Sequence, residues 1–349
     1  MTNSREKYSR AKLGRLVVAP LMATMFSISA ANAADFDLTF QTHFSAESLK
    51  GKNVQSLVDD IERMSGGRVD IEMFYSASLV KATETFDAAV NGVIDGDMTG
   101  AAYQTGKDPA FQFVGDILGG YDTPWEMYSW FYYGGGLEAA QPLYHKHDMH
   151  VVGWWISGQE SLSSTSPLKS VEDFKDWKFR SPPGIQTEIF AELGASPIVM
   201  DFGEVFTALE TKIIDGADAS NIATNSEIGL YDIAKHATYP GFHSMPADHL
   251  AINKEVWDSL PDDIQAIIEV AMEKMAFRET LSHSVEMGTA AQAAQANGVT
   301  LYNWNAEQRE AFRTFSRAKW EEWGKKTKEA GELVDSHIAF MKQIGLITK

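Results

Sequence analysis

Apolar and polar positions alternate, and then repeat with helical spacing, along the first hundred residues. Residues 36–40 alternate as a strand with one buried face does, and residues 46–64 carry apolar side chains three or four positions apart, as an amphipathic helix does. The same pair of patterns follows at 68–75 and 81–93, and residues 95–99 resume a short strand. The order strand, helix, strand, helix, strand predicts a mostly parallel sheet covered by helices.

A similar pattern returns in the middle of the chain. We expect, in order, a strand at 150–156, a capped short helix at 170–173, a strand at 177–180, a helix at 185–193, a strand at 197–200 and a helix at 202–212. Residues 213–218 then resemble residues 93–97, because both run through Ile-Asp-Gly into a short strand. Two such segments predict two α/β lobes of similar construction.

The last third of the chain is dominated by helical patterns. After a strand at 249–253, residues 261–296 form one Ala- and Glu-rich stretch without internal Pro, ended by Asn297-Gly298. A helix of about 35 residues is about 50 Å long, which is longer than a lobe is wide, so it should cross both lobes. A strand at 299–302 and helices at 306–326 and 329–344 complete the predicted elements.

The first 33 residues differ from the rest. A basic start, with Arg5, Lys7 and Arg10 among its residues, precedes an apolar stretch over 16–28 and the small-residue pattern Ala31-Asn32-Ala33. This order is typical of a cleaved secretory signal peptide, and the apolar stretch is too short for a stable membrane-spanning helix. The alternative is an uncleaved N-terminal anchor. We predict export of a soluble protein to the periplasm.

Composition and charge exclude several functions. The 349 residues include 30 Lys and Arg against 48 Asp and Glu, which gives a formal charge of -18 at pH 7. This acidic excess argues against nucleic acid or an anionic membrane as the partner. The chain has no Cys, which excludes disulfides, thiolate metal sites and Cys nucleophiles. The hydrophobic fraction of 44% is that of a folded globular protein of about two domains.

Motifs of the common enzyme classes are absent from the sequence. It contains no G-x-S-x-G, H-E-x-x-H, P-loop or G-x-G-x-x-G pattern. The triplet Gly134-Gly135-Gly136 is more typical of a helix end than of a phosphate cradle. His145, His147 and His150 lie at a junction between a helix and a strand, where solvated imidazoles are more common than a metal site.

Three polar residues stand at or just after predicted strand ends. Arg180 ends a strand before Ser-Pro-Pro-Gly, Asp218 ends another, and Gln159 follows a third. Ligands bind outside the carboxyl ends of strands in open α/β sheets, and a guanidinium there can pair bidentately with a carboxylate. The alternative for Arg180 is a salt bridge within the protein. No nucleophile with its general base is evident, so binding of an anion fits better than catalysis.

Motifs along the whole exported part together resemble the solute-binding subunits of tripartite ATP-independent periplasmic (TRAP) transporters, of the DctP type. The motifs are Asp95-Gly96, Tyr103 to Ala110, Phe131 to Gly136, Ser166 to Phe174 running into Lys178-Phe179-Arg180, Asp215 to Asp218, Tyr239 to His243, and Ile252 to Trp257 with Leu260-Pro261. Each motif alone is weak evidence for the resemblance, but the motifs in this order behind a leader are specific to this kind of protein. The resemblance implies a two-lobed periplasmic binding-protein fold of the α/β class.

The branch that this chain most resembles binds 2-oxoacids and hydroxy acids. The resemblance implies that Arg180 salt-bridges the ligand carboxylate. It also implies that no cofactor is obligatory, although a bound Na⁺ or Ca²⁺ can bridge the ligand to Gln159, Asp218 and the carbonyl of Ala219. Some relatives have Glu-Trp where this chain has Asp218-Ala219, which should widen the pocket here.

Further pocket residues are expected on the same basis. Tyr103 could donate its hydroxyl to the ligand, and His243 could make a polar contact. Phe44, Trp155 and Phe242 could wall the pocket, although each could equally belong to the core.

The resemblance also implies an organisation and partners. We expect residues 34–155 with about 247–285 in lobe I, about 156–246 with 286–326 in lobe II, and 327–349 as a C-terminal helix that could be exchanged in a homodimer. The membrane permease would be the partner, and no nucleic acid is expected. The alternatives are a ligand of another class (a C4-dicarboxylate or aromatic acid), an ABC-type binding protein, a secreted hydrolase or lyase, and a sensor subunit.

Overall fold

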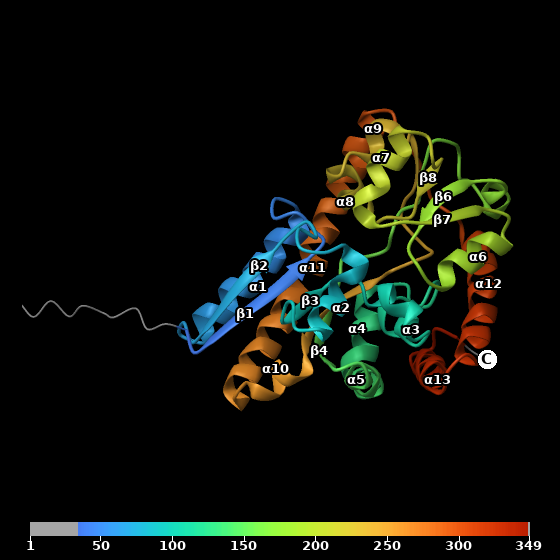
Figure 1. Ribbon diagram of the computed structural model, residues 1–349. Coiled ribbons are helices and arrows are strands. Elements are labelled where there is room, and N and C mark those ends of the chain that lie inside the picture. Colours follow the sequence, from blue (N-terminus) through green and yellow to red (C-terminus); the bar gives the residue numbers. More distant parts are fainter. Residues whose placement is uncertain (1–33, 348–349) are drawn as a thin grey trace, which may run out of the picture. The chain divides into compact units, whose positions relative to one another are not determined.

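Residues 34–347 are described in a computed structural model, and they contain two β-sheets flanked by helices (Figure 1). The predicted leader, residues 1–33, lies outside the described residues. The first sheet has the order β2-β1-β3-β10-β4. Its strands are β1 (Phe36–Thr42), β2 (Val69–Phe74), β3 (Gly96–Met98), β4 (Met149–Ile156) and β10 (Ala247–Asn253). The first three strands run parallel as expected, but β10 is antiparallel to both β3 and β4, so the sheet is mixed.

The second sheet has the order β11-β9-β5-β8-β6-β7. Its strands are β5 (Ser163–Ser164), β6 (Lys178–Ser181), β7 (Ser196–Val199), β8 (Gly216–Ala217), β9 (His236–Thr238) and β11 (Thr300–Tyr302). Strand β6 pairs in parallel with β7 and β8, as the alternating pattern of strands and helices predicted. Strands β5 and β9 were not predicted, because both are too short to show a period.

Helices cover both sheets. The α-helices are α1 (Leu49–Met64), α2 (Thr85–Val90), α3 (Phe111–Gly115), α4 (Pro124–Tyr133), α5 (Gly136–Lys146), α6 (Ile185–Glu192), α7 (Val205–Glu210), α8 (Ile222–Glu227), α9 (Leu230–Ile233), α10 (Lys254–Ser259), α11 (Asp262–Ala296), α12 (Ala306–Gly324) and α13 (Lys328–Gln343). Four short 3₁₀ helices of the described residues are η1 (Ala82–Glu84), η2 (Ala101–Gly106), η3 (Val171–Phe174) and η4 (Phe202–Glu204). The glycine triplet separates α4 from α5, as a helix boundary should.

The repeated Ile-Asp-Gly segment has the same structure in both sheets. In the first, the Asp95 N–H donates to the Thr39 carbonyl (2.7 Å) as β3 joins β1; in the second, the Asp215 N–H donates to the Lys178 carbonyl (2.6 Å) as β8 joins β6. The glycine is required in the first copy, because a Cβ at Gly96 would lie 2.5 Å from the Phe40 ring. The expectation of two similarly built α/β units is confirmed.

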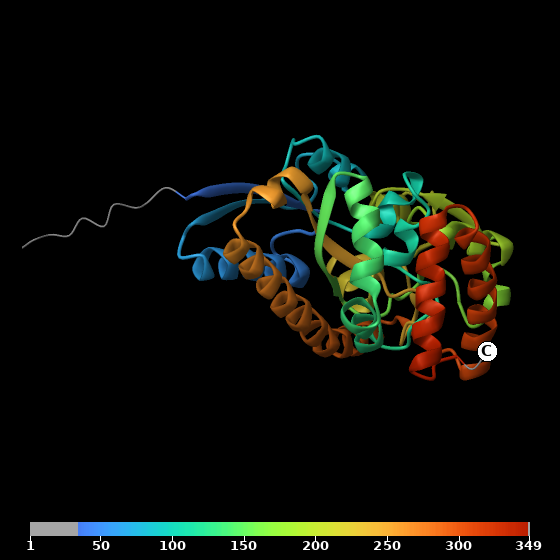
Figure 2. The same ribbon diagram turned by 90° about the horizontal axis from the view of Figure 1, so that it is seen from below.

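The long helix α11 connects the two units. It packs on α1 and β4 beside the first sheet, and on α8 and β11 beside the second. Figure 2 shows its length, in orange, below the first sheet. The predicted crossing of both units is therefore confirmed. No helix in the range 34–347 is long and apolar enough to span a bilayer.

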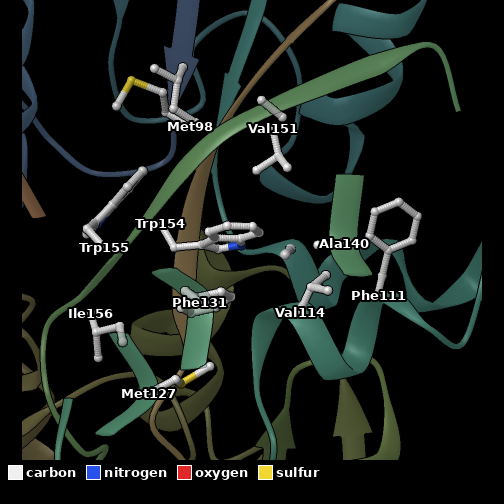
Figure 3. Close-up of a cluster of buried hydrophobic side chains, with 14 of the residues drawn as sticks. Met98, Phe111, Val114, Met127, Phe131, Ala140, Val151, Trp154, Trp155 and Ile156 are labelled. Atoms are coloured by element: carbon white, nitrogen blue, oxygen red, sulfur yellow. The ribbon is translucent and has the colours of Figure 1, made fainter. Parts of the chain in front are cut away.

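Strand β4 carries the centre of the largest hydrophobic core. Trp154 stacks on Phe131 of α4, with ring centroids 4.1 Å apart (Figure 3). Trp155 points to the other face of the strand, because successive side chains alternate, and it is only 1% exposed. Both faces of β4 are thus covered, and Trp155 belongs to the core.

The C-terminal helices α12 and α13 lie side by side and antiparallel (Figure 2). Helix α13 also packs on α3 and α5 of the first unit. His337 anchors it there: Nδ1 lies 2.9 Å from the Tyr121 hydroxyl, and Nε2 lies 2.7 Å from the Phe113 carbonyl. Exchange of α13 between two chains stays a prediction, as do the exact lobe boundaries.

Candidate functional site

A pocket lies between the two sheets and draws residues from both. The first unit contributes Phe44 after β1, Tyr103 on η2 and Asp248 on β10. The second contributes Arg180 on β6 and Ala219 just after β8. Strand ends therefore meet here, as expected for an α/β sheet.

Arg180 places a guanidinium at this pocket. Its side chain is 2% exposed, Nε donates to the Met200 carbonyl (3.2 Å), and Nη1 donates to the Asp218 carbonyl (2.6 Å). Nη2 is buried and has no hydrogen-bond partner. A buried guanidinium with one free nitrogen is fixed in orientation and ready to pair with an anion.

Tyr103 and Phe44 lie on the first unit's side of the pocket. Burial raises the pKa of Tyr103 to about 12, so its hydroxyl stays protonated and can donate. The ring of Phe44 is covered by the ammonium of Lys50, 4.3 Å from its centroid. These two residues occupy the places that the sequence predicted for them.

Lys50 and Asp248 also line the pocket, and the sequence did not single them out. Lys50 is 5% exposed; Nζ lies 3.8 Å from an Asp248 carboxylate oxygen and donates to the hydroxyl of Ser220 (3.3 Å). Ser220 follows β8, so this hydrogen bond joins the two sides of the pocket. The signal that could have found Lys50 is its place in the first turn of the helix after β1, at the carboxyl end of a strand of the first sheet, as Arg180 is near the carboxyl end of a strand of the second.

Two further carboxyl groups lie deeper. The Ser244 hydroxyl lies 2.7 Å from Asp116 Oδ2 and 2.8 Å from Glu160 Oε2. One hydroxyl carries one hydrogen, so one of the two carboxyls must itself be protonated and donate to the serine oxygen. Burial accordingly raises the pKa of Asp116 to about 7 and that of Glu160 to about 8.

Beside them lie Asp218 and His243, both 0% exposed. His243 Nε2 is 3.1 Å from Asp218 Oδ1. Burial raises the pKa of Asp218 to about 6 and lowers that of His243 to about 4, so the imidazole is neutral at pH 7. Arg180 and Glu160 line the pocket, whereas Asp218 lies beside Glu160 without lining it.

Residues 40–327 match the model of the DctP family, described as bacterial extracellular solute-binding protein, family 7. That match covers most of the chain. The chain belongs to the DctP family of TRAP transporter solute-binding proteins.

Relatives in the family agree with this assignment. The chain is 26% identical over 300 residues to the monocarboxylate 2-oxoacid-binding periplasmic protein of Nostoc sp., covering 83% of this chain and 80% of the relative. A TRAP periplasmic solute-binding protein from Rhodobacter sphaeroides, solved in an open form without ligand, shares 32% identity at a TM-score of 0.72 (90% of this chain, 100% of that one). One from Pseudoalteromonas atlantica, solved with bound sodium and pyruvate, shares 26% at a TM-score of 0.80 (89% and 95%).

The cation site that the resemblance implied, at Gln159, Asp218 and the Ala219 carbonyl, stays a prediction. Gln159 Nε2 donates to the Asp122 carbonyl (3.2 Å), and Gln159 lines a smaller space that shares Ser244 with the pocket. A carboxylate oxygen of the next residue, Glu160, lies within 4.8 Å of one of Asp218. Ala219 does line the pocket.

Phe242 and Trp155 also lie elsewhere than expected. Phe242 is 3% exposed and stacks on Trp304, with ring centroids 4.1 Å apart. It lines the smaller space with His243, and Trp155 lies in the core of β4. Of the three aromatic residues expected on the wall of the pocket, only Phe44 is there. Aromatic residues fill cores as readily as pockets, and sequence alone does not separate the two.

Proposed function

We propose that this DctP-family protein captures a small organic acid, a 2-oxoacid or 2-hydroxy acid of the pyruvate or lactate class, and delivers it to a membrane permease. The observation that carries the proposal is the free Nη2 of Arg180, buried at the pocket. The relatives solved with pyruvate or named for 2-oxoacids support this ligand class. Export by the leader at 1–33 to the periplasm belongs to the same proposal.

The energetics of capture are adequate. A hydrogen bond to a charged group contributes about 1.5–3 kcal/mol, and micromolar affinity requires about −8 kcal/mol. This binding free energy can come from Arg180, Tyr103 and the apolar wall of the pocket once water is excluded. Contacts that join the two sides, such as that from the Ile185 N–H to Gln112 Oε1 (2.9 Å), would stabilise closure around the acid. The closed form would then dock on the permease.

Calorimetric titration with pyruvate and lactate tests the role of Arg180. We expect Arg180→Ala to weaken binding at least about a hundredfold, since a charged partner is lost in a buried site, and Arg180→Lys to recover only part of it. Arg63→Ala, which removes an exposed guanidinium of α1, is the control and should bind as the wild type does. Equal affinity of wild type and Arg180→Ala would rule the assignment out.

A dicarboxylate is the second candidate ligand, because Lys50 places a second cation at the pocket. Malonate and succinate should then bind more tightly than pyruvate, and Lys50→Met should weaken them selectively. If Lys50→Met affects both classes equally, the monocarboxylate proposal is favoured.

We also propose binding without turnover. The acid recovered after prolonged incubation with the protein should be chemically unchanged by NMR. Steady conversion to a product would favour the hydrolase or lyase alternative.

A further inference from the structure

Glu160, Asp218 and His243 form a buried group of metal-ligand type. One carboxylate oxygen from each acid and one ring nitrogen all lie within 4.8 Å of one another. Glu160 lines the ligand pocket, whereas His243 lines the smaller space. The group therefore borders a cavity on each side.

The facing atoms of this group lack hydrogen-bond partners. Neither ring nitrogen of His243 has one, and the carboxylate of Asp218 has none beyond the neighbouring Glu160 carboxyl, although both side chains are 0% exposed. The 3.1 Å contact between them does not have the geometry of a hydrogen bond. Charged groups removed from water are normally paired or coordinated to a metal, because an unpaired buried charge is costly.

One of the two acids has an outer hydrogen-bond partner, since the Ser244 hydroxyl lies 2.8 Å from Glu160 Oε2. The backbone of Asp218 is fixed by Arg180 Nη1, which donates to the Asp218 main-chain carbonyl at 2.6 Å. Metal ligands in proteins are usually oriented by outer hydrogen bonds of this kind.

We propose that Glu160, Asp218 and His243 bind a divalent transition-metal ion, Zn²⁺ more tightly than Mn²⁺. An imidazole nitrogen suits these ions, whereas Na⁺ and Ca²⁺ favour oxygen ligands throughout. Two carboxylates match the double charge of the ion. The ligands differ from the set that the family resemblance implied, Gln159, Asp218 and Ala219, and so does the class of ion.

Calorimetric titration of the exported chain, stripped with a chelator and free of organic acid, tests the site with metal alone. We expect one Zn²⁺ per chain, bound at least about a hundredfold more tightly than Ca²⁺. His243→Asn and Glu160→Gln should each weaken Zn²⁺ binding at least about tenfold. Co²⁺ should give visible absorption bands that change in His243→Asn.

His150→Asn is the matched control, because it removes an imidazole from the pair in which His145 Nε2 lies 3.3 Å from His150 Nδ1. Its tight Zn²⁺ binding should equal that of the wild type. Glu160→Gln preserves the side-chain shape and decides the question if His243→Asn does not fold. The proposal is overturned if the wild type takes up no Zn²⁺, if Ca²⁺ binds equally well, or if Glu160→Gln binds Zn²⁺ as the wild type does. Pyruvate titration of the same metal-free protein reports on the organic-acid proposal separately.

Discussion

Two buried aspartate–histidine pairs occupy comparable places in the two units, but they differ in the hydrogen bonds that the histidine ring makes. In the first, Asp97 Oδ2 lies 2.9 Å from His249 Nε2, and His249 Nδ1 lies 2.6 Å from the Tyr144 hydroxyl. In the second, Asp218 Oδ1 lies 3.1 Å from His243 Nε2, and neither ring nitrogen is hydrogen-bonded. We call Asp97–His249 the closed pair and Asp218–His243 the open pair.

A shift of one residue separates the two pairs. Gly96 pairs with Phe40 of β1 and Gly216 pairs with Phe179 of β6, so the two copies share one register. The next position is Asp97 in the first copy and Ala217 in the second, where the acid comes one residue later, as Asp218. Because strand side chains alternate between faces, the shift points the second carboxylate to the other side, beside Glu160. The comparison indicates how one scaffold yields a structural pair and a binding group.

Breaking the closed pair should have the largest effect on stability. His249→Asn leaves the carboxylate of Asp97 and the hydroxyl of Tyr144 buried without this partner, and loss of a buried partner costs about 3–5 kcal/mol. Urea unfolding should show this loss. The same change in the open pair, His243→Asn, should cost less than about 1 kcal/mol, because no hydrogen bond of the ring is lost. Equal losses of unfolding free energy in the two variants would show that the closed pair and the open pair do not differ.

Removing the charge of the open pair should stabilise the metal-free protein. Burial raises the pKa of Asp218, which means that folding disfavours its ionised form at pH 7. Asp218→Asn should therefore increase the free energy of unfolding by about 1–3 kcal/mol in the presence of a chelator. Asp97→Asn is the control and should decrease it. A decrease for both would indicate that the open pair is as well satisfied as the closed one.

A third buried histidine, His337, provides a comparison with the closed pair. Both of its ring nitrogens are hydrogen-bonded, but to a hydroxyl and a carbonyl and not to a carboxylate. Burial lowers its pKa to about 3, so the unfolded chain binds one proton more than the folded chain does between about pH 3 and the ordinary pKa near 6.5. Its contribution to stability is complete above pH 6.5 and falls by about 1.4 kcal/mol per unit as the pH drops below that value.

Urea unfolding of wild type and His337→Gln at several pH values measures this contribution as a difference in slope. Other groups titrate equally in both proteins, so they cancel. Parallel curves for the two proteins would show that His337 is protonated in the fold.

Most of the fold could be predicted from the sequence, because period and capping are local. Strand β1, helix α11 and the cap Ser170 of η3 follow from patterns within a few residues. The direction of β10 did not follow, since its partners β3 and β4 are far away in the chain. Helix α4 was also missed, because its run of aromatic residues shows no clear period.

The candidate site was predictable only in part. Arg180 ends a strand, and a strand end has a fixed place in the fold. Lys50 contacts Ser220, which is 170 residues away, and no local pattern reports such a contact. The choice between Gln159 and Glu160 depends on how a segment without regular structure turns after β4, which the amino acids alone do not show.

The smallest expected effect on binding affinity is that of replacing Gln159. Gln159 donates to the Asp122 carbonyl and lines the smaller space, and it is not among the residues that line the ligand pocket. Gln159→Ala should change pyruvate and Zn²⁺ affinity by less than about twofold, which corresponds to about 0.4 kcal/mol. Glu160→Gln, one residue away, should weaken Zn²⁺ binding at least about tenfold. A tenfold loss of pyruvate or metal binding in Gln159→Ala would instead identify the amide as a ligand and contradict the assignment of that role to Glu160.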